Sequence, residues 1–306
     1  MNLLIIKLGA TGDVVRTTPL MHRFPGCITW ITEAKNKLLL EGVRGNLRCF
    51  SWDDRNEALD LRYDLAINLE DTMDVALFLK NVRCSEIFGA YIDSENLLRY
   101  TKNSAPWFDL SLISAYGKEE ADKLKFLNRR TYQDMIFAGL GFQFAGETYF
   151  LPQPIETGLS GDVAIAADSG PVWPMKKWAY YADLKRELEE EGLRVNILPT
   201  RSSLLQHLAD VRSHRCLVGG DSLPMHFALG TETHCVTLFT CTSPWEIYDY
   251  GFQRKILSHR LGEFFYQRDY NERATSAIAL AEVKNAVMTQ LQATKPARTL
   301  PSAALP

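Results

Sequence analysis

The segment Lys7-Leu8-Gly9-Ala10-Thr11-Gly12-Asp13-Val14-Val15-Arg16-Thr17-Thr18-Pro19 comes directly after the apolar run Leu3-Leu4-Ile5-Ile6. This pattern predicts a buried strand, a glycine-containing turn and a helix that begins near the Thr-Thr-Pro triplet, because glycine tolerates turn conformations and proline fits a first helical turn. In open α/β sheets, ligands bind outside the carboxyl ends of the strands. Asp13 is therefore expected in a turn that faces a binding crevice, which makes it the leading candidate for a catalytic group.

Short apolar runs alternate with segments of helical spacing along the rest of the chain. The expected strands are 3–8, 27–31, 46–50, 65–69, 163–167, 193–198, 216–219 and 235–240. The expected helices are 33–41, 72–82, 118–142, 179–191, 203–212 and 283–291, with a short one after Ser222. This alternation is typical of parallel sheets with helical crossovers, so we predict an α/β protein with two Rossmann-like domains. Their expected bounds are 1–150 and 151–291, followed by a mobile tail over 292–306.

The composition is that of an ordinary globular protein, with 46% apolar and 23% charged residues among 306. A net charge of -3 gives no general attraction to nucleic acid or to an anionic membrane surface. No apolar run has the length of a signal peptide core or of a spanning helix, so we expect a cytoplasmic protein. Six cysteines without any Cys-x-x-Cys pair indicate buried, reduced thiols.

Two loops of the second half carry groups suited to a diphosphate. The first, 168–178, contains Ser169, Lys176 and Lys177 between a strand and a helix. Ammonium groups and helix N-terminal amides both attract phosphate oxygens, although a Lys-Lys pair alone is more often a solvated surface feature. The tryptophans of this loop are interpreted as packing residues.

The second such loop is Gly219-Gly220-Asp221-Ser222-Leu223-Pro224-Met225-His226, which again follows an apolar strand. Ser222 is expected to cap the helix that follows, Gly230 to end it, and Asp221 to accept hydrogen bonds from sugar hydroxyls. His226 is expected to be a packed histidine rather than a catalytic one. The loop that contains Thr242 follows the next strand at the same edge.

Several other chemistries lack their motifs. The first loop has Gly-x-x-Gly rather than Gly-x-Gly-x-x-Gly, which disfavours a nicotinamide or flavin enzyme. A P-loop would end in Gly-Lys-Ser or Gly-Lys-Thr, and no such triplet occurs there. The chain also has no Asp-x-Asp triplet to chelate a metal diphosphate. We therefore expect side chains and helix N-termini to stabilise the negative charge on a leaving phosphate.

Four segments taken in order resemble those of the heptosyltransferase family, the ADP-heptose-dependent glycosyltransferases of lipopolysaccharide core assembly and their relatives. They are Ile6-Lys7-Leu8-Gly9-Ala10-Thr11-Gly12-Asp13-Val14 with Thr18-Pro19, Trp173-Pro174-Met175-Lys176-Lys177-Trp178, Asp221-Ser222-Leu223-Pro224-Met225-His226, and Leu238-Phe239 through Thr242-Ser243-Pro244. Together they span both predicted domains. The resemblance implies two Rossmann-like domains that face each other across a cleft, the GT-B arrangement.

The resemblance further implies an inverting, metal-independent transfer of heptose from ADP-heptose to an acceptor hydroxyl. By this likeness Asp13 is the general base, Lys176 stabilises the leaving diphosphate, and Asp221 holds the heptose. Lys7 and Gly12 support the first loop. The other expected contacts to the nucleotide sugar are Ser169, Lys177, Ser222, Leu223, Met225, His226 and Thr242. No cofactor or metal is expected, and the acceptor stays open among a lipopolysaccharide-type saccharide, a protein and a small molecule.

The chain also departs from the family pattern. Leu223 stands where the family usually has glycine and is expected to crowd the diphosphate or shift the turn. The region 262–266 has no thiol, so no structural iron or zinc site is expected. Arg16, Arg99, Arg129 and Arg130 are interpreted as exposed, solvated side chains, and at most a peripheral membrane contact is expected. A sugar-nucleotide epimerase of the same fold and a non-catalytic sugar-nucleotide-binding relative are the alternatives.

Overall fold

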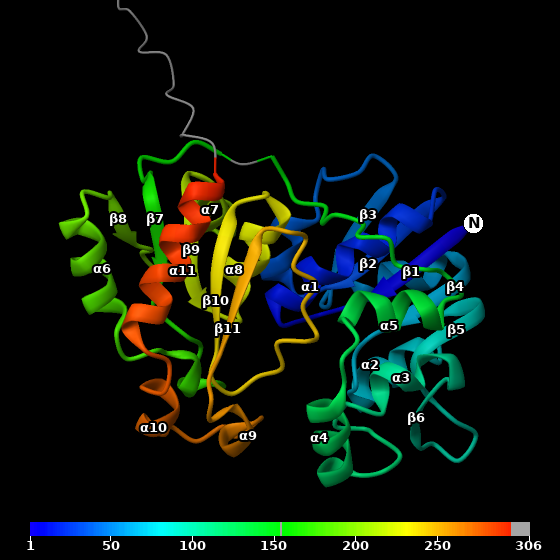
Figure 1. The fold of residues 1–306 in the computed structure, drawn as a ribbon. Helices are drawn as coiled ribbons and strands as arrows, with labels where there is room; N and C mark the ends of the chain where they lie inside the picture. The colour runs from blue at the N-terminus through cyan, green and yellow to red at the C-terminus, as the bar shows by residue number, and fades with distance from the viewer. Residues whose placement is uncertain (154, 295–306) are drawn as a thin grey trace, which may run out of the picture.

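The computed structural model describes residues 1–153 and 155–294 and contains two sheets flanked by helices (Figure 1). The N-terminal sheet has the strand order β3-β2-β1-β4-β5-β6. All neighbours in it are parallel except the β5–β6 pair at one edge. Its strands are β1 (Asn2–Ile6), β2 (Cys27–Thr32), β3 (Leu47–Ser51), β4 (Arg62–Asn68), β5 (Arg83–Ile92) and β6 (Leu98–Tyr100).

The C-terminal sheet is entirely parallel and has the order β11-β10-β9-β7-β8. Its strands are β7 (Gly161–Ala166), β8 (Val195–Ile197), β9 (His214–Gly220), β10 (His234–Phe239) and β11 (Gln253–Leu257). The expected α/β class with two parallel sheets is thus confirmed. The domain bounds 1–150 and 151–291 stay a prediction, and most of the expected tail, residues 295–306, lies outside the described residues.

Helices cover both faces of each sheet. In the N-terminal half these are α1 (Thr11–Thr17), α2 (Met73–Leu79), α3 (Ala105–Phe108), α4 (Lys118–Leu127) and α5 (Tyr132–Gly139), with the 3₁₀ helices η1 (Thr18–Arg23), η2 (Ala34–Leu39), η3 (Arg55–Asp60) and η4 (Lys102–Ser104). The C-terminal half has η5 (Pro174–Lys176), α6 (Tyr181–Glu190), α7 (Leu204–Arg212), α8 (Leu223–Gly230), α9 (Leu261–Phe264), α10 (Glu272–Thr275) and α11 (Leu280–Ala293). None of these helices has the length and apolarity needed to cross a membrane.

Burial on both faces explains the unbroken apolar runs. In β1, Leu3 and Ile5 pack on one face of the sheet while Leu4 and Ile6 pack on the other, and all four are buried. Side chains alternate between faces along a strand, so a strand covered on both sides shows no polar alternation. The run before Lys7 is therefore a central strand of a covered sheet.

Two expectations about helices and one about cysteines were only partly right. The predicted helix 118–142 is two helices, because Asn128 takes an extended conformation and Thr131 then caps α5 by accepting a hydrogen bond from the Asp134 amide. The predicted 33–41 helix is the 3₁₀ helix η2. All six cysteines are free, but only Cys216, Cys235 and Cys241 are buried.

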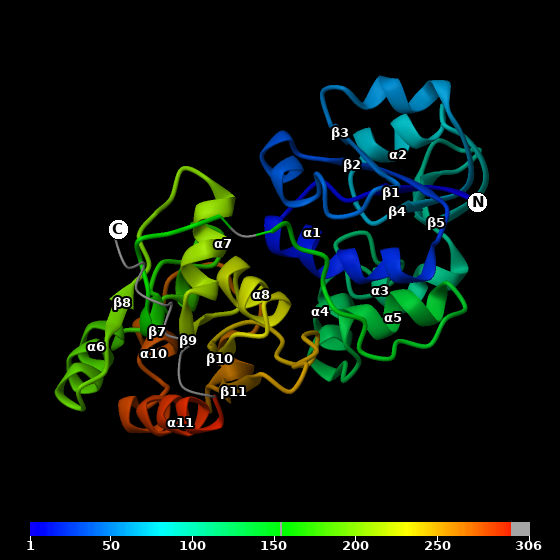
Figure 2. The same ribbon diagram turned by 90° about the horizontal axis from the view of Figure 1, so that it is seen from above.

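The two halves pack directly on each other between the sheets. Figure 2 shows α1 of the N-terminal half beside α8 of the C-terminal half, and these helices are in contact. Val15 and Leu39 belong to the same apolar cluster as Phe227 and Leu229 of the opposite half. The contact between α1 and α8 sets the position of the first loop.

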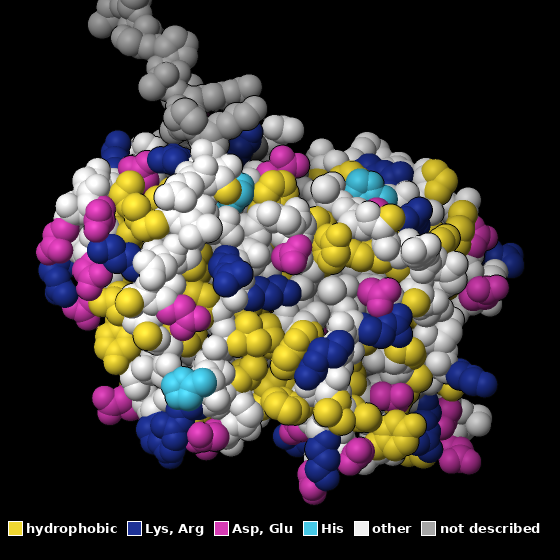
Figure 3. Space-filling model, in the orientation of Figure 1, with side chains coloured by type: hydrophobic (Ala, Val, Ile, Leu, Met, Phe, Trp, Pro, Cys, Tyr) yellow, Lys and Arg dark blue, Asp and Glu magenta, His cyan; other side chains and the backbone are white. Residues whose placement is uncertain are grey.

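On the face shown in Figure 3, acidic and basic side chains are interspersed.

Candidate active site

Asp13 lies inside the first turn of α1, not in a turn before the helix as predicted. The α-helix begins because the Asp13 and Val14 amides both donate to the carbonyl of Ala10, at 2.8 and 3.1 Å. Thr18 and Pro19, expected at the helix start, instead begin the 3₁₀ helix η1 that continues α1. The Asp13 side chain remains 34% exposed, so its carboxylate is accessible to a ligand.

A network of buried polar groups holds the loop before α1. One oxygen of Glu70, Oε1, accepts a hydrogen bond from the Leu8 amide at 2.8 Å and lies 2.9 Å from Nζ of Lys7. Asn36 donates to the Leu8 carbonyl at 2.7 Å and accepts from the Thr11 hydroxyl at 2.8 Å. Glu70 and Asn36 were missed by sequence reasoning, because each acts from a different strand–helix connection. They fix the path of the chain into α1.

Lys176 and Asp221 form an ion pair at the carboxyl edge of the C-terminal sheet. Nζ of Lys176, in η5, donates to the Asp221 carbonyl at 2.5 Å and lies 3.1 Å from the Oδ2 atom of Asp221. Gly220 permits this approach, because a Cβ at that position would lie 3.0 Å from the Lys176 carbonyl oxygen. Lys176 is 12% exposed, whereas Lys177 is 63% exposed and lies near Asp168. Lys176 is therefore nearly buried, whereas Lys177 is in contact with solvent. Ser169, in the loop that precedes both lysines, is half-buried.

The N-terminus of α8 has no side-chain cap. Ser222 occupies the N-cap position, but its hydroxyl donates to the Gly220 carbonyl at 3.4 Å and accepts no helix amide. The predicted capping by Ser222 is thus wrong, although Gly230 ends the helix as expected. Met225 is buried in the cluster between the halves, and half-buried Leu223 packs against that cluster. At the start of α8, Pro224 has no amide hydrogen and the Met225 amide donates to the Ser222 carbonyl at 3.1 Å, which leaves the Leu223 amide to meet an anion.

His226 is a buried, neutral histidine at the contact between the halves. Its side chain packs against Gly12, where a Cβ would lie 2.8 Å from the imidazole Cδ2 atom. Its Nδ1 lies 3.3 Å from the Tyr149 hydroxyl. Burial and the nearby charge of Arg16 lower the pKa of His226 to about 4. Gly12 therefore makes the close approach of α1 and α8 possible.

Both carboxylates of the site are ionised at neutral pH. Burial raises the pKa of Asp13, but the positive charges of Arg16 and Lys7 outweigh this effect and hold the pKa below its usual value. Burial likewise opposes ionisation of Asp221, and the charge of Lys176 outweighs it, so that this pKa is also lowered. The negative charge of Asp221 acts against this lowering of the Asp13 pKa.

Arg16 differs most from its sequence interpretation. It is 9% exposed rather than solvated, and its Nε lies 3.0 Å from Oδ1 of Asp13. Its guanidinium also lies 3.8 Å from the carboxylate of Glu246, which comes from the opposite half. No signal in the sequence connects two residues so far apart in the chain, and Glu246 was missed for this reason.

Two hydroxyls next to the site are buried without partners. Thr242 and Ser243 follow β10 and are 3% and 2% exposed. Neither hydroxyl makes a hydrogen bond with the described residues. Buried polar atoms of native proteins are almost always satisfied, so these two need a water molecule or a ligand. The same loop is held by Lys255, which donates to the Pro244 carbonyl at 2.7 Å.

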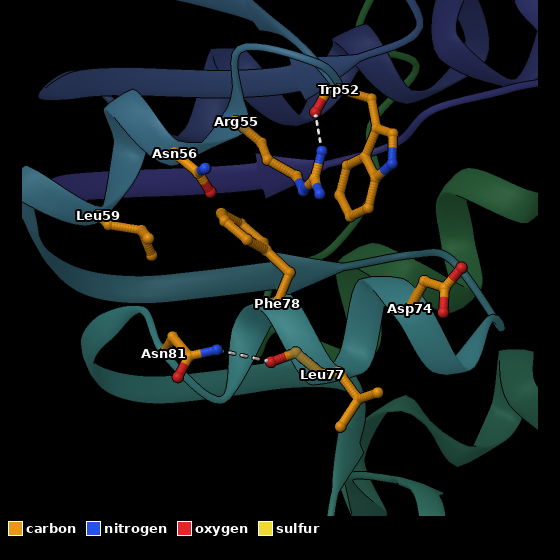
Figure 4. A pocket seen from close by; sticks show the side chains of 8 residues that line it. All are labelled: Trp52, Arg55, Asn56, Leu59, Asp74, Leu77, Phe78 and Asn81. Atoms are coloured by element: carbon orange, nitrogen blue, oxygen red, sulfur yellow. Dashed lines mark hydrogen bonds between the residues drawn. The ribbon is translucent and has the colours of Figure 1, made fainter.

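A hollow on the N-terminal half is separate from these groups. It has a volume of about 360 Å³ and lies between η3 and α2, where Trp52, Arg55 and Phe78 line it together with Asp74 and Asn81 (Figure 4). Arg55 covers the Trp52 ring at 4.3 Å from its centroid. None of the predicted site residues lines this hollow. Within residues 1–153 and 155–294, no three His, Cys, Asp or Glu side chains are grouped to hold a metal ion.

The structure thus brings Asp13, Lys176, Asp221 and His226 to facing edges of the two halves. Asp221 pairs with Lys176, and its negative charge also raises the pKa of Asp13, against the stronger effect of Arg16 and Lys7. Lys177 points to solvent and Met225 lies in the core. The four convergent residues come from four different segments, which only the fold brings together.

Comparison with known proteins gives structural matches only. No protein-family model matches the chain, and no curated protein matches it by sequence. The glycosyl transferase family 9 protein from Veillonella parvula superposes with a TM-score of 0.69 at 15% identity, over 96% of this chain and 98% of that one. E. coli heptosyltransferase WaaC with ADP gives a TM-score of 0.59 at 13% identity, with 95% and 100% covered. E. coli ADP-heptose lps heptosyltransferase II gives 0.59 at 16% identity, again with 95% and 100% covered.

These matches extend over both sheets and almost every described element. At such low identity, a shared fold is what they establish. The resemblance first seen in four short segments is confirmed at the level of the whole fold. The chain has the two-sheet GT-B fold of the heptosyltransferases, including WaaC and the family 9 glycosyltransferases.

Proposed function

We propose that the protein is a glycosyltransferase of the heptosyltransferase type, which transfers heptose from ADP-heptose to an acceptor hydroxyl with inversion. One observation carries this proposal: an ionised, partly exposed Asp13 of the N-terminal half lies on the edge that faces the Lys176–Asp221 pair of the C-terminal half, in a chain with this fold. Two of the similar structures are E. coli heptosyltransferase WaaC with ADP and the same protein with ADP-2-deoxy-2-fluoro heptose. These ligands fit the Lys176 cation and the helix N-terminus of the present site.

In the proposed mechanism, Asp13 accepts the proton of the acceptor hydroxyl as its oxygen attacks the anomeric carbon. The bond from that carbon to the diphosphate oxygen breaks on the opposite face, and ADP leaves. Because Arg16 and Lys7 keep the pKa of Asp13 low, the carboxylate is ionised and ready to accept the proton at neutral pH. A positioned base of this kind contributes about 10²–10⁴-fold to the rate.

The developing negative charge on ADP meets the groups of the C-terminal half. Lys176 supplies a positive charge, and the N-terminus of α8 adds the Leu223 amide and the positive end of the helix dipole. The Asp221 carboxylate accepts hydrogen bonds from the sugar hydroxyls while it keeps Lys176 in place. Preorganised charge of this kind is typically the largest single contribution to group transfer.

The two lysines of the 174–178 segment provide a matched test. Lys176→Met removes the buried cation, and we expect it to weaken ADP binding by about 10- to 100-fold in a calorimetric titration. Lys177→Met removes an exposed cation and is expected to change the affinity by less than about twofold. Equal effects of the two substitutions would contradict the assignment of Lys176 to the diphosphate.

The reaction itself is tested with ADP-heptose and candidate acceptors, with ADP release and the product linkage as readouts. Asp13→Asn is expected to bind ADP normally and to lose transfer by about 10²–10⁴-fold. A normal rate in Asp13→Asn would refute the proposed base. Incubation with ADP-heptose alone separates the alternatives, because an epimerase changes the sugar without an acceptor and a binding protein leaves it intact.

A further inference from the structure

Arg16 lies between two carboxylates from opposite halves of the molecule. Its Nε is 3.0 Å from Oδ1 of Asp13, one helical turn earlier on α1. Its Nη1 is 3.8 Å from Oε2 of Glu246, on the loop after β10. The contact with Asp13 is an ion pair rather than an aligned hydrogen bond. The guanidinium therefore connects the proposed base to the other half of the protein.

The surroundings leave this guanidinium little freedom. Its carbon lies 4.3 Å from the centroid of the Tyr132 ring and 5.5 Å from that of Trp107. The Glu246 carboxylate also accepts a hydrogen bond from the Tyr266 hydroxyl at 3.2 Å. In addition, the Glu246 carbonyl accepts from the Tyr132 amide at 2.9 Å, which ties the loop to α5. A planar guanidinium held by stacking and by a fixed carboxylate is a rigid support for Asp13.

The charges around Asp13 define what Arg16 does to it. Lys7 lies on the strand side, Arg16 on the same helix, and His226 and Asp221 on the elements packed against α1. Tyr132 and Glu246 face the guanidinium from α5 and from the β10 loop. His226 is neutral at physiological pH, so Arg16 and Lys7 are the cations in this set that favour ionised Asp13.

We propose that Arg16 is the positioning residue for Asp13, and that Glu246 from the opposite half holds Arg16 in place. This inference rests on the proposed function, in which Asp13 is the general base. It also accounts for two carboxylates on one arginine. When Asp13 accepts a proton and loses its charge, Glu246 still balances the buried guanidinium, and no unpaired charge is left in the interior. The site thus tolerates both protonation states of its base.

The test compares Arg16→Met, Arg16→Lys and Glu246→Gln with the unaltered protein, using kcat from about pH 4.5 to 9 and the dissociation constant for ADP. Arg16→Met is expected to lower kcat by about 10²-fold, because the carboxylate loses its fixed direction. It is also expected to move the acidic limb of the kcat profile to higher pH, because Asp13 loses its nearest cation. Binding of ADP should stay within about threefold, since Arg16 lies on the base side of the site.

The conservative variants separate charge from geometry. Arg16→Lys is expected to restore the acidic limb and only part of kcat, because an ammonium group cannot stack and pair in the way a guanidinium does. Glu246→Gln is expected to lower kcat several-fold without moving the limb upward, since it removes no cation from Asp13. Arg186→Met is the matched control, because Arg186 forms an exposed i,i+3 pair with Asp183 on α6. It should behave as the unaltered protein.

The outcomes are distinguishable. If Asp13→Asn loses transfer but Arg16→Met keeps the original acidic limb, Arg16 has a merely structural role and the inference is wrong. If Asp13→Asn transfers at the normal rate, Asp13 is not the general base, and the proposed function is wrong at that point before Arg16 is considered. Should Arg16→Met fail to fold, Arg16→Gln, which is neutral and closer in shape, provides the same comparison of acidic limbs.

Discussion

At Gly12, the addition of one methyl group is expected to disturb the packing of the two halves strongly. A Cβ on Gly12 would lie 2.8 Å from Cδ2 and 3.4 Å from Nε2 of His226, and 3.7 Å from Cα of Leu223. The imidazole is 4% exposed and is held near the Tyr149 hydroxyl, so it has little room to move. Gly12→Ala must therefore push α8 away from α1 or strain the ring.

Two opposing effects set the expected magnitude. Alanine in a helix is favoured over glycine by up to about 1 kcal/mol. Overpacking a well-filled contact costs about 1–3 kcal/mol. Because the close contact involves a buried ring and not a flexible side-chain end, we expect the second effect to win, and the free energy of unfolding to fall by about 1–2 kcal/mol. Transfer should also slow, since Asp13 is the next residue on α1.

Urea unfolding of Gly12→Ala measures this loss. Gly158→Ala is the control, because a Cβ on Gly158 meets nothing within 4 Å. The double variant Gly12→Ala with His226→Ala removes the ring that the methyl meets, so its loss should be smaller than the sum of the single losses by about 1 kcal/mol or more. Unchanged or increased stability of Gly12→Ala, as helix propensity alone would give, would refute the reasoning.

Three further substitutions test other parts of the structure. Glu70→Ala should slow transfer about 10-fold or more in the ADP-release assay, because it frees the loop before α1 and leaves the buried Lys7 ammonium unpaired; an unchanged rate would contradict this. The free energy of unfolding should fall as pH drops from 6.5 towards 4, because unfolding lets His226 take up a proton that burial denies it. This decrease amounts to up to about 3 kcal/mol, and His226→Asn should remove it in urea titrations at several pH values. Asp210→Ala should lower the free energy of unfolding by about 2–4 kcal/mol, because it removes a fully buried carboxylate whose Oδ2 lies 2.7 Å from Nε of Arg201; a urea midpoint equal to that of the unaltered protein would argue against it.

The sequence predicts the strands whose residues are buried one after another, because such strands are mainly apolar. The strands β1, β4, β7 and β10 each contain a run of at least four consecutive buried residues, so each appears as a mainly apolar run. By contrast, β5 carries exposed Arg83, Ser85 and Glu86, and β11 lies at an edge with exposed Arg254 and Leu257. A strand with several exposed residues has a mixed composition, which hides it from a search for apolar runs.

The candidate site was predictable where a functional group lies on the connection between a buried strand and the helix that follows it, or at the start of that helix. Asp13 and Asp221 are of this kind, since the carboxyl ends of parallel strands are where ligands bind. Arg16, Glu70 and Glu246 are not, because their importance depends on which residues the fold places opposite them. The sequence suggested a solvated Arg16. The structure shows that Arg16 is buried and that it lies near Glu246 of the other half.

Leu223 shows how a departure from the family pattern fits this chain. Where a glycine would leave the first turn of α8 bare, the leucine side chain packs against the apolar cluster that includes Val15 and Leu39 of the N-terminal half. Any motion that separates the sheets must expose this surface, at about 25 cal/mol for each Å² of apolar area. Leu223 thus opposes separation of the halves, and the Arg16–Glu246 contact opposes it at the base itself. Both favour an arrangement of Asp13 and Lys176 that exists before any substrate binds.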